Sequence, residues 1–127
     1  MINFSKNSVF NLKPISESEI QKDALSLFIA NENIIGAYKT IRDQVIFTNK
    51  RIIAVDVQGI TGKRKEYSTL PYSKIQYFSV QTPGFAEAIP DCEMELYFTN
   101  GFMARFEFKG ECNIIELGKI ISEYVLS

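Results

Sequence analysis

Apolar residues in the middle of the chain recur at every second position or in short unbroken runs, which is the pattern of β-strands rather than of helices. The clearest case is the segment 44–56. Its two apolar, β-branched runs flank the polar residues 48–51, where Asn49 tolerates a positive φ at little cost, so a β-hairpin is predicted. Both faces of this hairpin are apolar, which indicates a place at the centre of a small barrel or sandwich.

Further strands are predicted on both sides of the hairpin, separated by turns rich in glycine, proline or asparagine. Residues 82–91 contain Pro83, Gly84 and Pro90 and are expected to form a loop. The seven expected strands are residues 34–41, 44–48, 51–57, 65–70 and 75–82, and two runs that contain residues 94–98 and 102–108.

The connection between the last two strands follows from side-chain alternation. A two-residue turn at Asn100 and Gly101 would put the apolar rows of the two strands on opposite faces. A three-residue loop, 99–101, with Gly101 in a left-handed conformation puts both rows on one face. The expected pairs are Phe98 with Phe102, Leu96 with Ala104, Met94 with Phe106 and, on the outer face, Glu95 with Arg105.

Two amphipathic helices are predicted at the ends of the domain. The first begins at Ser16, because Ser16 and Glu19 match a capping box, and it extends to about residue 30. The second is capped by Asn113 and has one wide apolar face. Gly118 lies on that face and lowers the stability of the helix by about 1 kcal/mol relative to alanine. We interpret it as a point of close approach to the sheet.

Length and charge fit a single domain with its own hydrophobic core. The 14 basic and 15 acidic residues leave a formal net charge of −1, which argues against general binding to nucleic acid, because phosphate neutralisation needs a basic face. No apolar run reaches bilayer length, and the first residues lack the apolar core of an export signal. We therefore expect a cytoplasmic protein in which Cys92 and Cys112 are free thiols.

Residues suited to catalysis or metal binding are sparse. The chain has no histidine, and its two cysteines lack the spacing of a zinc site. The run GITGK at 59–63 has two residues between its glycines where a P-loop has four, so we interpret it as a tight turn between strands. Glu93 and Glu95 share a strand face, which is also the pattern of a solvated face. We therefore predict no enzyme activity, no metal and no cofactor.

Several stretches of the chain resemble the bacterial pleckstrin-homology (PH) domain family. They are Arg42-Asp43, FTNKRI at 47–52, DVQGITGK at 56–63 and LPYSKI at 70–75. The resemblance implies a mainly β, PH-like, seven-stranded antiparallel barrel or sandwich capped by a C-terminal α-helix and preceded by an extra N-terminal helix. It also implies no known enzymatic activity and assembly into ring-shaped homo-oligomers, with pentamers expected. The domain would then comprise residues 16–127, with residues 1–15 as an arm that is either loosely ordered or docked on a neighbouring surface.

Two surface features are candidate binding sites. Apolar residues of the arm and of the loop 82–91 have no place in the predicted sheet, so we expect contacts there with another copy or with a protein partner. The residues in question are Ile2, Phe4, Phe85 and Ile89. The alternative is a site for an anionic lipid or phosphate made by cations at hairpin ends. Those cations are Lys50, Arg51, Lys63, Arg64 and Lys65.

The first alternative, a self-assembling module that binds an unknown protein, is our main hypothesis. Short basic runs at hairpin ends commonly protect sheet edges, so a solvated turn is the simpler explanation of these cations. The chain also departs from the lipid-binding eukaryotic relatives, because it has no tryptophan and because Arg42 is followed by Asp43 rather than by more basic residues. Membrane lipid is therefore not expected as a partner.

Overall fold

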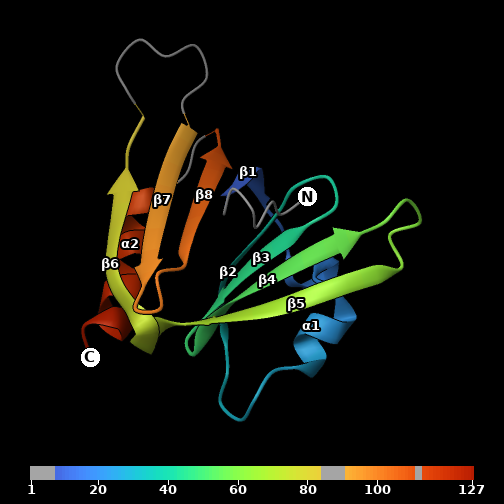
Figure 1. Ribbon diagram of the computed structural model, residues 1–127, viewed down its shortest axis with the longest axis horizontal. Helices are drawn as coiled ribbons and strands as arrows, with labels where there is room; N and C mark the ends of the chain where they lie inside the picture. Colours follow the sequence, from blue (N-terminus) through green and yellow to red (C-terminus); the bar gives the residue numbers. More distant parts are fainter. Residues whose placement is uncertain (1–7, 84–90, 111–112) are drawn as a thin grey trace.

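An eight-stranded sheet curls around the core of the protein, with a helix across its open side (Figure 1). The computed structural model describes residues 8–83, 91–110 and 113–127. The strand order is β5-β4-β3-β2-β1-β8-β7-β6. Strands β1 and β8 run parallel, and the other neighbours run antiparallel. The mainly β architecture with a C-terminal helix is therefore confirmed.

The elements lie close to the predicted ones from residue 34 onward. The strands are β1 (Ser8–Pro14), β2 (Ile34–Lys39), β3 (Gln44–Thr48), β4 (Arg51–Gln58), β5 (Arg64–Pro71), β6 (Ile75–Gln81), β7 (Asp91–Phe98) and β8 (Met103–Lys109). The helices are the 3₁₀ turns η1 (Glu17–Glu19) and η2 (Tyr72–Lys74) and the α-helices α1 (Lys22–Ser26) and α2 (Ile114–Val125).

The β3–β4 hairpin is buried on both faces, as its sequence predicts. Every residue of β3 is buried. Phe47 and its same-face neighbours belong to the larger core, which α2 covers. Ile46 and Ile53 belong to a smaller core on the opposite face, covered by Ile20 and Ala24. Full burial of such a side chain contributes roughly 1.5 to 3 kcal/mol, so this hairpin stabilises both halves of the core.

Strand β1 corrects the prediction of an arm for the part of residues 1–15 that the structure describes. Ser8–Pro14 joins β2 to β8 and makes the sheet continuous. Its residues Val9 and Leu12 are 2% and 0% exposed and lie in the larger core. Asn11 has a positive φ of 60°, and the register with β8 shifts between Val9 and Leu12. This irregularity breaks the alternation by which a strand is recognised in a sequence.

The predicted single helix over residues 16–30 is also wrong. The chain instead forms η1 and then α1, which has five residues. Ile20 lies between them in an extended conformation and is buried in the smaller core. The predicted capping box of Ser16 and Glu19 is present, and in it the Ser16 N–H donates to Glu19 Oε2 at 3.1 Å. The segment still covers the sheet, but as two short turns.

The hairpin between β7 and β8 has the predicted three-residue loop. The Phe98 N–H donates to the Phe102 carbonyl at 2.8 Å, and Gly101 has a φ of +89°. The pairs Leu96–Ala104, Met94–Phe106 and Glu95–Arg105 all match the expected register.

Helix α2 also confirms two sequence-based predictions. Asn113 Oδ1 accepts a hydrogen bond from the Glu116 N–H at 3.1 Å. A Cβ at Gly118 would lie 3.1 Å from Cγ1 of Val80 on β6, so the glycine does mark a close approach between helix and sheet.

Cys92 is joined in a disulfide bond, so the prediction of free thiols is wrong for this residue. It is buried in β7, at 1% exposure. The other cysteine, Cys112, lies outside the described residues. Because disulfides are rare in a reducing cytoplasm, the thiol argument for a cytoplasmic location no longer holds.

Candidate binding surfaces

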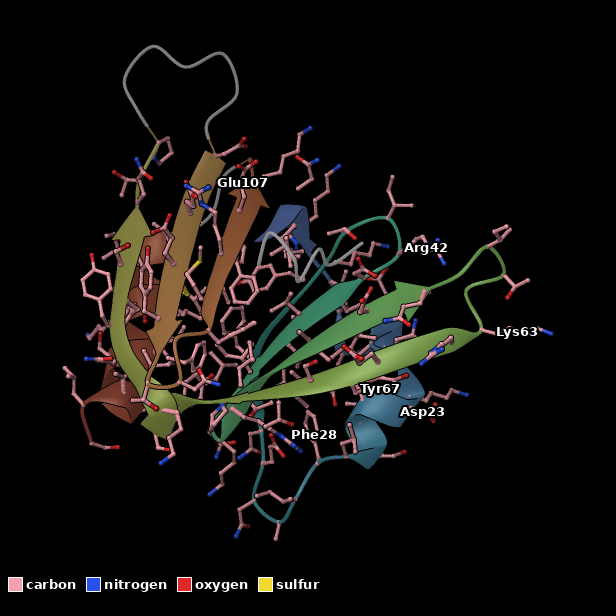
Figure 2. All side chains as sticks on the ribbon, viewed as in Figure 1. Asp23, Phe28, Arg42, Lys63, Tyr67 and Glu107 are labelled. Atoms are coloured by element: carbon pink, nitrogen blue, oxygen red, sulfur yellow. The ribbon has the colours of Figure 1, made fainter. Side chains whose placement is uncertain are left out.

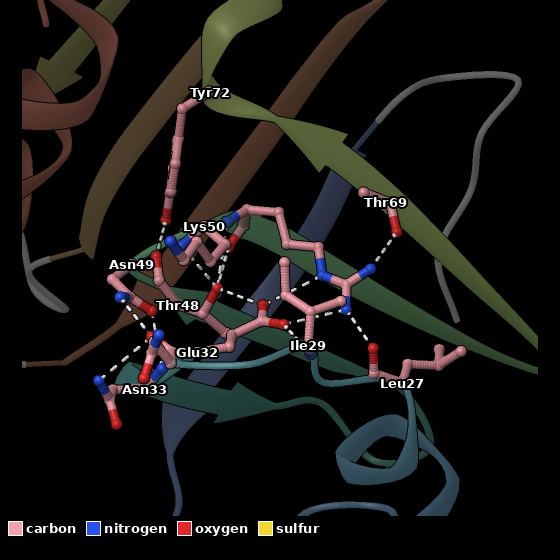
Figure 3. A network of polar contacts seen from close by, with 11 residues as sticks. Leu27, Ile29, Glu32, Asn33, Thr48, Asn49, Lys50, Thr69 and Tyr72 are labelled. Atoms are coloured by element: carbon pink, nitrogen blue, oxygen red, sulfur yellow. Dashed lines mark hydrogen bonds and ion pairs between the residues drawn. The ribbon is translucent and has the colours of Figure 1, made fainter.

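Arg51, one of the predicted anion-binding residues, is occupied inside the protein. Its guanidinium contacts both oxygens of Glu32, with Nε to Oε2 at 3.0 Å and Nη2 to Oε1 at 3.1 Å (Figure 3). Arg51 also donates to the carbonyl of Leu27 and to the hydroxyl of Thr69. With its donors used in this way, Arg51 does not offer a site to an external anion.

The partner of Arg51, Glu32, has a side chain with 0% exposure. Burial alone would raise the pKa of the Glu32 carboxyl, but hydrogen bonds from Arg51, Thr48 and the Ile29 amide outweigh burial and hold the pKa below its ordinary value. The Tyr72 hydroxyl donates to the Thr48 carbonyl at 2.7 Å and links this network to the larger core. The network thus fastens the turn before β2 to the β3–β4 hairpin.

Sequence reasoning missed Glu32, because the residue lies in the polar run NEN at 31–33 and shows no motif. Its partner Arg51 is 19 positions away along the chain. In the sequence, such a pair is visible only as one carboxylate in one turn and one guanidinium in another. Nothing in the sequence shows that these two turns lie close together in the fold.

The other four predicted anion-binding residues do not form one cluster. Lys63, Arg64 and Lys65 are exposed at the beginning of β5. Lys50 is exposed in the β3–β4 turn, next to Arg51. In the pairing of β4 with β5, Arg51 lies opposite Pro71, at the other end of β5. A strand of this length spans roughly 25 Å. The cations therefore mark two separate basic ends of one strand.

Two turns, each with one exposed isoleucine, lie beside each other at the Lys63 end. Figure 2 shows Lys63 where one turn joins β5 and Arg42 on the neighbouring turn. The Arg42 guanidinium donates to the carbonyl of Gly59 and joins the two turns. Ile41 and Ile60, at the two tips, are 101% and 104% exposed. As predicted, the run at 59–63 is a tight turn between β4 and β5.

A cleft of about 600 Å³ lies at the opposite end of β5. One wall comes from β5, with Leu70 and Pro71, and the other from the β7–β8 hairpin, with Phe98 and Phe102. Lys74 also lines it. The sequence does not predict this cleft, because its walls come from segments that are distant along the chain.

A pair of tyrosines is exposed on the outer face of β6 and β7. Tyr77 lies opposite Tyr97, and Tyr97 lies opposite Met103 on β8. The two rings are 5.2 Å apart, and the residues are 58% and 38% exposed. This apolar row on a sheet face has no cover among the described residues.

Carboxylates lie next to the tyrosines on the same outer face. Arg105 forms ion pairs with Glu93 and with Glu95, the latter at 3.1 Å. Glu107 lies opposite Glu93. Burial, together with Asp91 and Glu93, raises the pKa of the Glu107 carboxyl. Arg105 therefore offsets part of the negative charge on this face, and the carboxylates remain in excess around it.

The predicted partner contacts of the arm and of the loop 82–91 are not placed by the structure. The predicted partner contacts Ile2, Phe4, Phe85 and Ile89 all lie outside the described residues. Within the ranges 8–83, 91–110 and 113–127, no three carboxylate or thiol side chains gather where they could hold a metal ion. In the same ranges, neither α-helix is long and apolar enough to cross a bilayer.

Comparison with known proteins decides the family. Residues 3–125 match the bacterial PH domain family. The chain belongs to this family. The uncharacterized protein YjqA of Bacillus subtilis (strain 168) is 32% identical over 114 residues, which cover 88% of this chain and 90% of YjqA.

Two crystal structures confirm the PH-like fold. A pleckstrin-homology domain protein from Shewanella loihica PV-4 superimposes with a TM-score of 0.76 and 30% identity, over 92% of this chain and 99% of that one. A pleckstrin homology domain from Shewanella amazonensis SB2B gives a TM-score of 0.61 and 34% identity, over 89% and 93% of the two chains. In the described part of this PH domain, the exposed features include the tyrosine pair, the isoleucine tips and the edge of β5 with its cleft.

Proposed function

We propose that this bacterial PH domain is a non-enzymatic interaction module that assembles with copies of itself into a cyclic homo-oligomer, expected to be a pentamer, and binds a protein partner. The observation that carries the proposal is the exposed pair of Tyr77 and Tyr97. Aromatic residues are enriched at the centres of protein interfaces, where neighbouring polar residues form the rim. The tyrosine row, with Glu95 and Arg105 beside it, has this composition.

The charge of the protein also supports self-assembly. The formal net charge of −1 means that copies repel one another only weakly. A surface that docks on a different surface of the next copy makes a head-to-tail contact, and such contacts close into a ring when the rotation between neighbours allows it. The ring and its pentameric form rest on the family resemblance.

Size-exclusion chromatography with light scattering tests this function at micromolar concentration. Wild-type protein is expected to elute as an oligomer, and Tyr77→Ser with Tyr97→Ser is expected to shift it to the monomer. Ile60→Ser is the matched control, because it removes a fully exposed apolar side chain from a turn away from that face. A monomeric wild type would refute the assembly, whereas an oligomer that survives the tyrosine changes would refute this interface.

A second candidate function, binding to an anionic membrane surface or phosphate, is favoured by the isoleucine tips. Ile41 and Ile60 are fully exposed on adjacent turns, with Arg42 and Lys63 beside them. Apolar tips flanked by cations are typical of proteins that insert side chains into the interface of an anionic bilayer. Of the five cations first considered, Arg51 is excluded by its pairing with Glu32.

Liposome co-sedimentation at physiological salt separates the two functions. If the membrane function is correct, anionic vesicles will sediment the wild type but not Ile41→Ser with Ile60→Ser, and neutral vesicles will sediment neither. Equal recovery of all samples in the supernatant would exclude this function and leave the interaction module.

A further inference from the structure

We propose that the open edge of β5 binds an extended acidic segment of a partner protein as an added strand, with one apolar side chain of that segment in the adjacent cleft. This surface differs from the tyrosine face proposed for self-assembly. The proposal rests on the protein-binding part of the proposed function, whereas self-assembly uses the other surface and can fail independently.

Hydrogen bonds of β4 show which way its backbone groups point. The Arg51 N–H donates to Thr48 Oγ1 at 3.0 Å, and the Val57 N–H donates to Asp43 Oδ1 at 2.8 Å. Both acceptors belong to β3 or to the residue before it. Because backbone groups alternate in direction along a strand, the odd-numbered residues of β4 face β3 and the even-numbered residues face β5.

The same alternation identifies the free groups of β5. The even-numbered residues of β4 pair with the even-numbered residues of β5, as in Ile52–Leu70 and Ala54–Ser68. The N–H and C=O groups of Lys65, Tyr67 and Thr69 must therefore point away from the sheet. In the part of the chain that the structure describes, β5 is the last strand on this side. Pro71 agrees with this geometry, since proline is tolerated where the missing N–H would face outward from an edge.

The cleft lies where an added strand would place its side chains. Strand alternation puts Ser68 and Leu70 on the same face of β5, and both line the cleft together with Phe98 and Phe102. A strand added beside β5 would direct every second side chain toward this cleft. The volume of about 600 Å³ lies in the range of small-ligand pockets, so it accommodates a large apolar side chain.

The charges along the edge favour an acidic occupant. The nearby acids are Glu66 on β5, the buried Asp56 opposite it on β4, and Asp23, which acts electrostatically on Tyr67. Cations outnumber them, and electrostatic complementarity of this kind speeds association and selects the partner. The exposed cations are Lys63, Arg64 and Lys65 at one end of the strand and Lys50 and Lys74 at the other.

The same charges disfavour a second copy of β5 as the occupant. Both ends of the strand are basic, so an antiparallel β5–β5 pair would place a basic end against a basic end at each side. A parallel pair would align the same cations directly. Like charges in register destabilise strand pairing, whereas an acidic segment meets neither obstacle.

The first test uses a displayed library of short random peptides, selected on the wild-type protein. We expect enriched peptides with Asp or Glu around a large apolar residue. The best peptide is then synthesised with N-methyl groups on one or the other alternating set of amides. N-methylation of the set that faces β5 should weaken binding about tenfold or more, which corresponds to 1.4 kcal/mol. N-methylation of the other set should change the affinity little. Equal effects of both sets, or no enriched peptide, would overturn the proposal.

The second test changes the protein. Thr69→Pro removes an outward N–H at a position where an edge tolerates proline, and Lys74→Glu reverses a charge at the cleft. Both are expected to weaken the selected peptide about tenfold. Lys119→Glu, on the exposed face of α2, is the matched control and should bind normally. Wild-type affinity in both test variants would overturn the proposal.

Lys74→Glu and the N-methylated peptides keep the test decisive if Thr69→Pro does not fold. If Thr69→Pro dissociates an oligomer and the library yields no enriched peptide, the edge of β5 binds a second copy of this chain. That outcome would also overturn the proposal.

Discussion

Glu32 is a fully enclosed carboxylate, and each of its oxygens has two donors. Oε2 accepts from Thr48 and from Arg51 Nε, and Oε1 accepts from the Ile29 amide and from Arg51 Nη2. A buried charge is tolerated only when it is matched in this way. A substitution of Glu32 or Arg51 should therefore destabilise the folded protein, because the remaining charge would be buried without its counterpart.

Glu32→Gln is expected to lower the free energy of unfolding by about 3 kcal/mol. The amide group of glutamine would turn an NH₂ toward donors that now meet an oxygen, and the Arg51 charge would lose its partner. Urea denaturation at pH 7 measures the change. Glu17→Gln, at an exposed position of η1, is the matched control and should have little effect.

The effect of Glu32→Gln should also depend on pH. The pKa of Glu32 is lower in the folded protein than in the unfolded chain, so its stabilisation is complete above the ordinary glutamate pKa of about 4.3. It is lost as the pH falls through the lower pKa of the folded state. The difference between wild type and variant should therefore shrink in acid, and a constant difference from pH 7 to pH 3 would contradict this explanation.

Gly101 is a residue whose backbone, rather than its contacts, restricts substitution. Its φ is +89°, and a Cβ there would meet no atom within 4 Å. Gly101→Val is therefore expected to destabilise the domain by about 1 to 2 kcal/mol through backbone strain alone. Gly101→Asn should cost less, since asparagine adopts positive φ more readily. Equal thermal stability of the valine and wild-type proteins would refute this.

At the scale of elements, α2 packs on the sheet at the contact between Gly118 and Val80. Local signals located this helix correctly, because its cap, its apolar stripe and its glycine all lie within one short segment. The β7–β8 register was also predictable, since strict alternation leaves one loop length that keeps both apolar rows on one face. Prediction failed for β1 and α1, where Asn11 and the extended Ile20 interrupt the expected periods.

Gly118→Ala tests the contact between helix and sheet. Alanine is the better helix former by about 1 kcal/mol, but its Cβ would lie 3.1 Å from Val80 Cγ1. We expect the close contact to offset the gain, so that the melting temperature falls or stays level. With Val80→Ala the obstruction is removed, and the two changes should show a coupling of about 1 kcal/mol in a double-mutant cycle. Additive effects would show that the contact is not restrictive.

At the scale of the whole molecule, the proposed binding surfaces arise where distant segments meet. The cleft combines β5 with the β7–β8 hairpin, and β5 is the last strand on its side of the sheet among the described residues. A sequence lists the cations of this region but does not show that Arg51 turns inward to Glu32 while Lys63 remains exposed. The family resemblance and the apolar residues left outside the predicted sheet led to the hypothesis of a binding module, but only the fold shows where its proposed surfaces lie.

Strand β1 connects the two halves of the sheet, and its loss should affect the whole fold. Leu12 is 0% exposed in the larger core, so Leu12→Ala is expected to cost about 3 kcal/mol of unfolding free energy. Lys13→Ala, at the exposed neighbouring position, should cost little.

Removal of residues 1–13 takes away the strand that pairs with both β2 and β8. It should therefore abolish cooperative urea unfolding and the dispersed amide spectrum, rather than only dissociate an oligomer. A truncated chain that keeps a native spectrum and the wild-type midpoint would show that β1 is dispensable.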